Sequence, residues 1–297
     1  MSPVTARRLV QRVSIGAAPR REPDQLAVEE PLELRVDGRS LAVTMRTPGA
    51  DFDLAAGFLV SEGVITGSGE LARMTYCTGT DVEEANRYNL LDIALGPGVA
   101  PPDPSVARAF FTTSSCGLCG KASIDAVHTR SAFSVREDPL RIAPTRLASL
   151  PDRLRAAQEM FEQTGGLHAA GLFDGATGEL LVLREDVGRH NAVDKVIGWA
   201  LRADRLPLRG TVLLVSGRAS FELTQKALMA GVPVLAAVSA PSSLAADLAA
   251  DSGMTLVGFL RHPSMVVYAG QERVAPEPAD DAPQPATELP GSRVRVP

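Results

Sequence analysis

The chain has 297 residues, of which 45% are hydrophobic and 22% are charged, the composition of an ordinary globular protein of about two domains. Its formal charge of -5, from 35 acidic and 30 basic residues, argues against a nucleic-acid-binding protein, and no uninterrupted apolar run reaches the ~18 residues of a membrane helix. The first 14 residues lack the apolar core and cleavage site of a secretory leader, so we expect a cytoplasmic protein.

The N-terminal part is predicted to begin with a flexible arm over residues 1–30, which are polar and contain several prolines. Residues 32–36 and 41–45 alternate apolar and polar side chains around Asp37-Gly38, a pattern typical of a β-hairpin.

A helix is expected over 51–65, capped by Asp51 or Asp53, and a strand over 88–95. We place an N-terminal α+β domain at residues 31–124, ending in a polar loop that contains two cysteines.

Further along the chain, short apolar strands alternate with helices, which predicts an α/β domain with a largely parallel sheet. The predicted strands cover 169–173, 179–184, 211–215, 234–238, 255–260 and 266–268, and the predicted helices cover 151–163, 191–202, 221–230 and 244–250. We place this domain at residues 125–272. Residues 273–297 contain too few large apolar side chains to fold, and we expect a disordered tail.

The strongest local motif is Cys116-Gly117-Leu118-Cys119, within a loop that also contains Lys121. A thiolate is the nucleophilic form of cysteine, and positive charge or backbone amides increase its population. The pair is compatible with a sulfur relay, with half of a zinc site, with a redox pair, or with no chemical role. Zinc needs two further ligands, and the remaining candidates form no second close pair; a redox pair is expected to open a helix after a strand. Cys77, alone in its segment, is expected to be a buried small side chain.

Three strand–turn–helix units follow one another, and two of their turns contain Gly-Arg, at Gly188-Arg189 and Gly217-Arg218. Helix N-terminal amides and an arginine fork favour phosphate, and open α/β sheets bind ligands at the carboxyl ends of strands. This pattern predicts a binding rim for an anionic, nucleotide-like ligand. The alternative is that these turns are routine helix caps formed by Asn191 and Ser220.

Asp186, His190, Asp194 and Lys195 surround the first of these turns. They are compatible either with a catalytic cluster or with an ion-pair network at the start of a helix. Nearby, His168-Ala169-Ala170 is similar to the His-x-Glu of zinc deaminases, but Ala170 replaces the glutamate that acts as general acid and base. Deaminase chemistry is therefore not expected, and no metal site is predicted.

With these motifs, the sequence resembles the formate dehydrogenase accessory sulfurtransferases, the FdhD type. The matching segments span about residues 30–272 and comprise Asp53 to Gly63, Thr113 to Lys121, Gly165 to Ala170, Glu185 to Lys195, and Ser216 to Glu222.

The resemblance implies a cytidine-deaminase-like α/β domain without zinc, and a homodimer. It also implies that a cysteine desulfurase places sulfur on Cys116 as a persulfide, with Cys119 assisting. The sulfur would then pass to the molybdenum cofactor, a bis-molybdopterin guanine dinucleotide, for use by formate dehydrogenase. By position, the cofactor-binding segment would be Phe259, Leu260, Arg261, His262, Pro263 and Ser264. The residue pattern itself places the cofactor phosphates near Arg189 and Arg218.

Two other functions remain open from the sequence. One is a non-catalytic chaperone that binds the molybdenum cofactor and inserts it into the dehydrogenase. The other is a zinc-dependent hydrolase, against which Ala170 argues.

Overall fold

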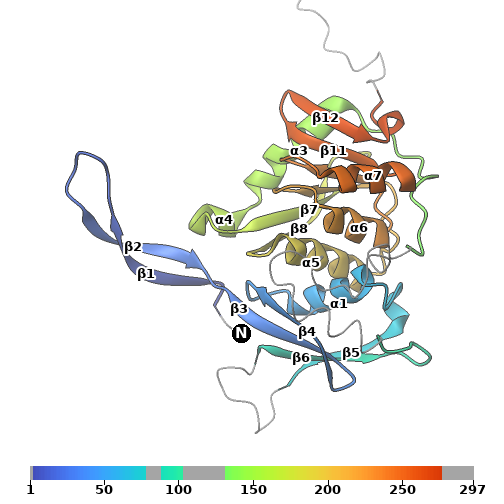
Figure 1. The fold of residues 1–297 in the computed structure, drawn as a ribbon, viewed down its shortest axis with the longest axis horizontal. Coiled ribbons are helices and arrows are strands. Elements are labelled where there is room, and N and C mark those ends of the chain that lie inside the picture. The colour runs from blue at the N-terminus through green and yellow to red at the C-terminus, as the bar shows by residue number, and fades with distance from the viewer. Residues whose placement is uncertain (1–2, 78–87, 103–130, 276–297) are drawn as a thin grey trace, which may run out of the picture.

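A computed structural model describes residues 3–77, 88–102 and 131–275 of the chain. Two lobes are stacked on each other (Figure 1), a small one built on a four-stranded sheet and a large one built on a six-stranded sheet. Helix α1 of the small lobe lies against helix α5 of the large lobe. None of the helices in these ranges is long and apolar enough to cross a membrane.

The small sheet has the strand order β4-β3-β6-β5. Its strands are β3 (Glu30–Val36), β4 (Arg39–Arg46), β5 (Leu71–Tyr76) and β6 (Leu90–Leu95), with the short helix η1 (Ser68–Glu70) before β5. The predicted hairpin is confirmed, and its turn has positive φ at both Asp37 and Gly38, as a two-residue hairpin turn requires. Strand β5 was not predicted: the alternation of polar and apolar side chains is confined to its last four residues, Arg73 to Tyr76, and its pairing with β6 shifts register after Leu71.

Helix α1 (Asp51–Ser61) is shorter than predicted and has no side-chain cap, so the expected cap at Asp51 or Asp53 is wrong. Both carboxylates are instead buried in ion pairs. Asp51 binds Arg46, and Asp53 binds Arg184 of the large lobe at 2.8 Å.

The N-terminal arm is a two-stranded antiparallel hairpin of β1 (Thr5–Arg12) and β2 (Arg20–Ala27) that projects from the body (Figure 1). The prediction of a flexible arm over residues 1–30 did not include these two strands. The strands escape recognition because nearly all their side chains are at least partly exposed, so neither face has the apolar alternation of a half-buried strand.

The large sheet has the order β12-β11-β10-β9-β7-β8. Its strands are β7 (His168–Asp174), β8 (Leu180–Asp186), β9 (Thr211–Val215), β10 (Val234–Ala237), β11 (Thr255–Arg261) and β12 (Ser264–Ala269). Only β9, β10 and β11 form parallel pairs, while β7 is antiparallel to both its neighbours and β12 is antiparallel to β11. The sheet is thus mixed, and the prediction of a largely parallel sheet is wrong.

Helices cover both faces of the large sheet (Figure 1). One face carries α3 (Pro144–Ala156), with α4 (Glu159–Thr164) at the end of the sheet; the other carries α5 (Arg189–Arg202), α6 (Phe221–Met229) and α7 (Ser243–Ser252). The single helix predicted over 151–163 is wrong, because Pro151 lies inside α3 and a separate helix follows it.

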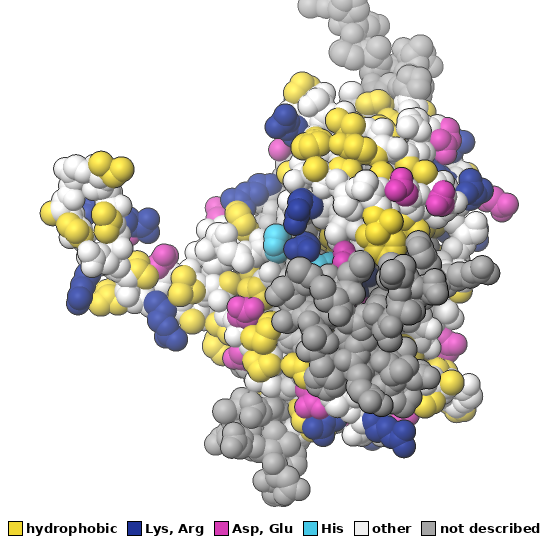
Figure 2. Space-filling model, viewed as in Figure 1, with side chains coloured by type: hydrophobic (Ala, Val, Ile, Leu, Met, Phe, Trp, Pro, Cys, Tyr) yellow, Lys and Arg dark blue, Asp and Glu magenta, His cyan; other side chains and the backbone are white. Residues whose placement is uncertain are grey.

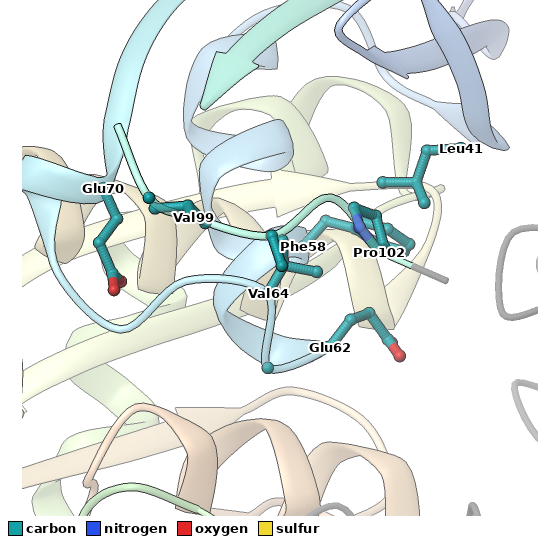
Figure 3. Close-up of a pocket in the computed structure, with 10 residues that line it drawn as sticks. Leu41, Phe58, Glu62, Val64, Glu70, Val99 and Pro102 are labelled. Carbon is teal, nitrogen blue, oxygen red and sulfur yellow. The ribbon is translucent and has the colours of Figure 1, made fainter. Parts of the chain in front are cut away.

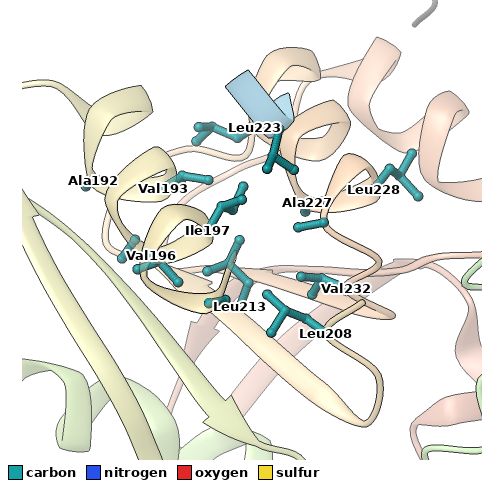
Figure 4. Packing of buried hydrophobic residues seen from close by; sticks show 14 of the residues in the cluster. Ala192, Val193, Val196, Ile197, Leu208, Leu213, Leu223, Ala227, Leu228 and Val232 are labelled. Carbon is teal, nitrogen blue, oxygen red and sulfur yellow. The ribbon is translucent and has the colours of Figure 1, made fainter. Parts of the chain in front are cut away.

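The main hydrophobic core is continuous across the two lobes, from Leu34 and Leu54 in the small lobe to Val193 and Leu213 in the large one. In the part shown in Figure 4, side chains of α5 and α6 meet above β9. A second core lies between α3 and the opposite face of the sheet.

The folded part of the chain extends past the predicted boundary at residue 272. Arg273, in η5 (Gln271–Arg273), is 1% exposed, and its guanidinium donates hydrogen bonds to the carbonyl oxygens of Gly253, Val135 and Arg136. The predicted disordered tail therefore cannot begin at residue 273, and residues 276–297 lie outside the described ranges.

Candidate functional site

The predicted binding turns lie at one edge of the large sheet. Strand β8 is antiparallel to β7, and β7 is antiparallel to β9, so β8 points the same way as β9, β10 and β11. The Gly188-Arg189 turn, the Gly217-Arg218 turn and residues 259–264 therefore gather at this edge, which we call the rim.

The first rim turn is fixed by Asp186, which is fully buried. Its Oδ1 accepts hydrogen bonds from the Gly188 amide at 2.8 Å and the Asn191 side-chain amide at 3.1 Å. Its Oδ2 lies 2.7 Å from Lys195 Nζ, and that ammonium also donates to the Thr47 carbonyl at 2.9 Å. This buried ion pair thus joins the end of β8, helix α5 and the small lobe.

A second buried ion pair involves Asp194, the residue of α5 immediately before Lys195. Asp194 Oδ2 is 2.8 Å from Lys226 Nζ of α6, and Asp194 Oδ1 accepts the Ser61 hydroxyl proton at 2.6 Å. Of the two interpretations left open from the sequence, the ion-pair network therefore applies to Asp186, Asp194 and Lys195.

His190 differs from these three because it lies at the rim and is part-exposed. Its Nε2 is 3.9 Å from Glu222 Oε2 at the start of α6. Partial burial would raise the pKa of Glu222, but His190, the Glu222 amide and the Ser220 hydroxyl together lower it to about 2. Glu222 is thus an anion at neutral pH and faces the imidazole.

The rim arginines have few partners. Arg218 and Arg261 are exposed, while Arg189 is half-buried and its Nε has no hydrogen-bond partner among the described residues. Of the helix caps suggested as the alternative, Ser220 does cap α6, but Asn191 does not cap α5, whose N-cap is Gly188. Unpaired guanidinium groups at strand ends can bind an anionic ligand.

Within the predicted segment 259–264, the side chains differ in exposure. Phe259 is 42% exposed and has a φ of 50°, and residues 261–264 are exposed as well. Leu260 is instead fully buried in the second core, so its side chain cannot contact a ligand at the surface.

His168 begins β7 at the same edge, where Ser216 holds the strand end by exchanging hydrogen bonds of 2.9 Å with the Ala169 backbone. Burial first, and then the charges of Arg189 and His190, lower the pKa of His168, so it is neutral at pH 7. Ala170, where a deaminase has its glutamate, is fully buried in the main core.

A cavity of about 800 Å³ opens beside His168, between the two helices α3 and α4 and the strand ends. The Arg155 guanidinium in its wall lies 4.3 Å from the centroid of the Phe161 ring. Gln158 is 6% exposed, lines the same cavity, and its side-chain amide makes no hydrogen bond within the described part of the chain. These three residues were missed because the sequence merged the two helices into one.

A separate cavity of about 430 Å³ lies in the small lobe (Figure 3), where Phe58, Val64, Val99 and Pro102 form an apolar wall. The Glu70 carboxylate at its side already accepts hydrogen bonds from the Thr66 and Gly67 amides. This cavity is not part of the rim.

Cys116 and Cys119 lie outside the described residues, so their predicted roles remain predictions. Cys77 is half-buried rather than buried, and burial, followed by the charge of Asp92, raises the pKa of its thiol. It therefore carries little thiolate at neutral pH.

Comparison with known proteins identifies relatives over almost the whole chain. The model of the FdhD/NarQ family matches residues 27–275. "Sulfur carrier protein FdhD" of Streptomyces avermitilis is 62% identical over 276 residues, which cover 93% of this chain and 97% of the relative. The protein of the same name from Mycobacterium tuberculosis is 58% identical, with 92% and 100% covered.

Among solved structures, that of a candidate formate dehydrogenase accessory protein from Desulfotalea psychrophila superposes with a TM-score of 0.71. It is 22% identical in sequence and covers 92% of this chain and 100% of its own, so it shares the fold. On the family match and the close relatives together, the chain belongs to the FdhD/NarQ family.

Proposed function

We propose that this protein is a sulfur carrier that serves formate dehydrogenase. Cys116 accepts sulfur from a cysteine desulfurase as a persulfide, and the terminal sulfur then passes to the molybdenum cofactor, a bis-molybdopterin guanine dinucleotide, which is the substrate bound at the rim. In this step the S–S bond breaks, Cys116 keeps its electron pair and leaves as a thiolate, and the acceptor supplies the electron pair of the new bond to sulfur. Cys119 assists the exchange. The reaction class is sulfur transfer through a persulfide relay, in the cytoplasm, by a homodimer.

The observation that carries the proposal is the convergence of both Gly-Arg turns and residues 259–264 at one sheet edge. Arg189, Arg218 and Arg261 provide guanidinium groups for the phosphates of a dinucleotide. The sulfur chemistry is supported by two relatives, 62% and 58% identical to this chain, that are described as sulfur carrier proteins.

The cavity beside His168 suits a planar base. The Phe161 ring and Arg155 offer a stacking surface, and the free amide of Gln158 offers both a donor and an acceptor for a base edge. Exposed Phe259 and residues 261–264 would contact the rest of the ligand, with Leu260 contributing only backbone.

The buried Ala170 supports a cytidine-deaminase-like layout in which the catalytic acid has been lost. Such a site binds a nucleotide-like ligand without hydrolysing it. This interpretation agrees with a carrier and leaves no role for a zinc-dependent hydrolase.

Sulfur loading is tested by intact-mass measurement after incubation with a cysteine desulfurase and cysteine. We expect the gain of one reductant-labile sulfur atom in the wild type and in Cys119→Ala, and none in Cys116→Ala. If no variant gains sulfur while ligand binding is intact, the protein is instead a chaperone that only binds and inserts the cofactor.

Ligand binding is tested separately by calorimetry with guanosine diphosphate. We expect Arg189→Ala and Arg218→Ala each to weaken binding about tenfold, the effect of losing one charged hydrogen bond. Arg209→Ala is the control, because Arg209 is exposed like Arg218 but lies at the opposite edge of the sheet, before β9. Equal loss in all three variants would mean that the rim does not hold the phosphates.

A further inference from the structure

All of the β1–β2 arm except Ala27 lies outside the segment matched by the family model, which begins at residue 27. It projects from the body (Figure 1), and its base is held by β2 packing on α4 and by the Val28 amide bonding to the Val4 carbonyl. Towards its tip, Leu9 is 68% exposed and Ile15 is fully exposed. A two-stranded hairpin with both faces in water is marginally stable, which points to a partner that covers it.

The two faces of the arm differ in charge. Cross-strand pairing places Arg12 beside Arg20 and next to Glu22 on one face, where Arg12 and Glu22 form an ion pair. The opposite face contains no acid. We call this opposite side the arm face, and it consists of Arg7, Leu9, Gln11, Arg21, Pro23 and Gln25. Its centre is the apolar Leu9–Pro23 pair, flanked by two arginines without an ion-pair partner in the described structure.

A complementary surface lies on the large lobe. Val266 and Tyr268 of the edge strand β12 are 45% and 37% exposed, and Leu244 on the adjacent helix α7 is 41% exposed. Asp247 and Asp251 follow Leu244 at helical spacing, and both are exposed and without an ion-pair partner among the described residues. We call these five residues the β12 patch. Figure 2 shows apolar side chains gathered over β11 and β12, with acidic ones nearby on the α7 side.

The arm and the rest of the chain have opposite net charges. Residues 5–27 contain five arginines and two acids, a net charge of +3. The rest of the chain contains 25 of the 30 basic residues and 33 of the 35 acidic residues, which is a net charge of -8. An arm of this charge is attracted to the body of another copy.

We propose that the arm face binds the β12 patch of a second copy of this chain; this rests on the homodimer of the proposed function and assigns an interface to it. Leu9 and Pro23 lie on Val266 and Tyr268, and Arg7 and Arg21 pair with Asp247 and Asp251. In a twofold dimer each arm makes the same contact, so the interaction occurs twice.

A charge-swap experiment tests this arrangement by light scattering coupled to gel filtration. Variant one is Arg7→Glu with Arg21→Glu, and variant two is Asp247→Arg with Asp251→Arg. Each alone places like charges together and is expected to raise the dimer dissociation constant on the order of a hundredfold. An equimolar mixture is expected to regain the dimer, because both contacts of the mixed pair are then oppositely charged.

The control is Arg8→Glu with Arg20→Glu, which changes the same charges on the other face of the arm and is expected to leave the dimer intact. Circular dichroism of each variant shows whether the protein is still folded, so that a loss of association is not confused with unfolding. A wild-type monomer, or a dimer that neither swap weakens, would overturn the proposal. So would a mixture of two folded variants that stays monomeric.

Discussion

Asp186 is the residue on which the position of the first rim turn depends, since it binds the turn, the helix and Lys195 at once. Asp186→Asn would leave the Lys195 ammonium buried without its counter-ion. We expect a loss of about 3–5 kcal/mol in the free energy of unfolding, measured by urea denaturation. Glu137→Gln, at an exposed carboxylate, is the control and should change stability by less than about 0.5 kcal/mol. Equal stability of both variants would show that the pair contributes nothing.

The sequence identified which polar residues matter at the rim, but it did not identify what each of them does. Asp186, His190, Asp194 and Lys195 lie within ten positions and are all able to titrate. Three are structural because their partners Thr47, Ser61 and Lys226 come from distant segments that periodicity does not bring together. The role of a polar side chain is thus decided by tertiary contacts.

The contact between α1 and α5 depends on Gly57 and Gly198, where the two helices cross with no side chain between them. A Cβ added at Gly57 would lie 1.8 Å from the Asp194 carbonyl oxygen, and one at Gly198 would lie 1.8 Å from that of Asp53. Either Gly→Ala variant must push the helices apart. We expect it to lose about 3 kcal/mol or more in stability, despite the better helix propensity of alanine.

The control for this prediction is Gly69→Ala, because a Cβ at Gly69 meets open space and its φ is not positive. That change should be neutral or slightly stabilising in the same thermal or urea measurement. If Gly57→Ala unfolds at the same midpoint as Gly69→Ala, the helices are not in the close contact described.

Elements with a buried face were predicted from sequence, and elements without one were not. Strand β9 was predicted to the residue, since its five side chains are all buried and four of them are apolar. The strands β1 and β2 were missed because no apolar alternation marks them, and β5 was missed because the alternation covers only its last four residues.

For the whole molecule, the binding turns share one edge of the sheet as predicted, although the sheet is mixed and not largely parallel as predicted. The reason is that β7 reverses direction and β8 restores it, so the strand before α5 still ends at the same edge as β9 and β10. Strand pairing of this kind depends on contacts between distant segments, which local patterns do not encode.

The continuous core and the ion pairs between the lobes predict that the molecule unfolds as one cooperative unit. Trp199, the single tryptophan, packs on the main core from α5, and the Arg205 guanidinium lies 5.1 Å from its ring. Its fluorescence reports the packing of α5 on the main core, whereas far-UV circular dichroism reports all helices and strands. We expect both signals to change at the same urea concentration.

Asp53→Asn, which weakens the contacts with Arg184 and Arg202, should lower that midpoint without separating the two curves. Two separate transitions in the wild type would mean that the lobes fold independently and that the shared core does not couple them.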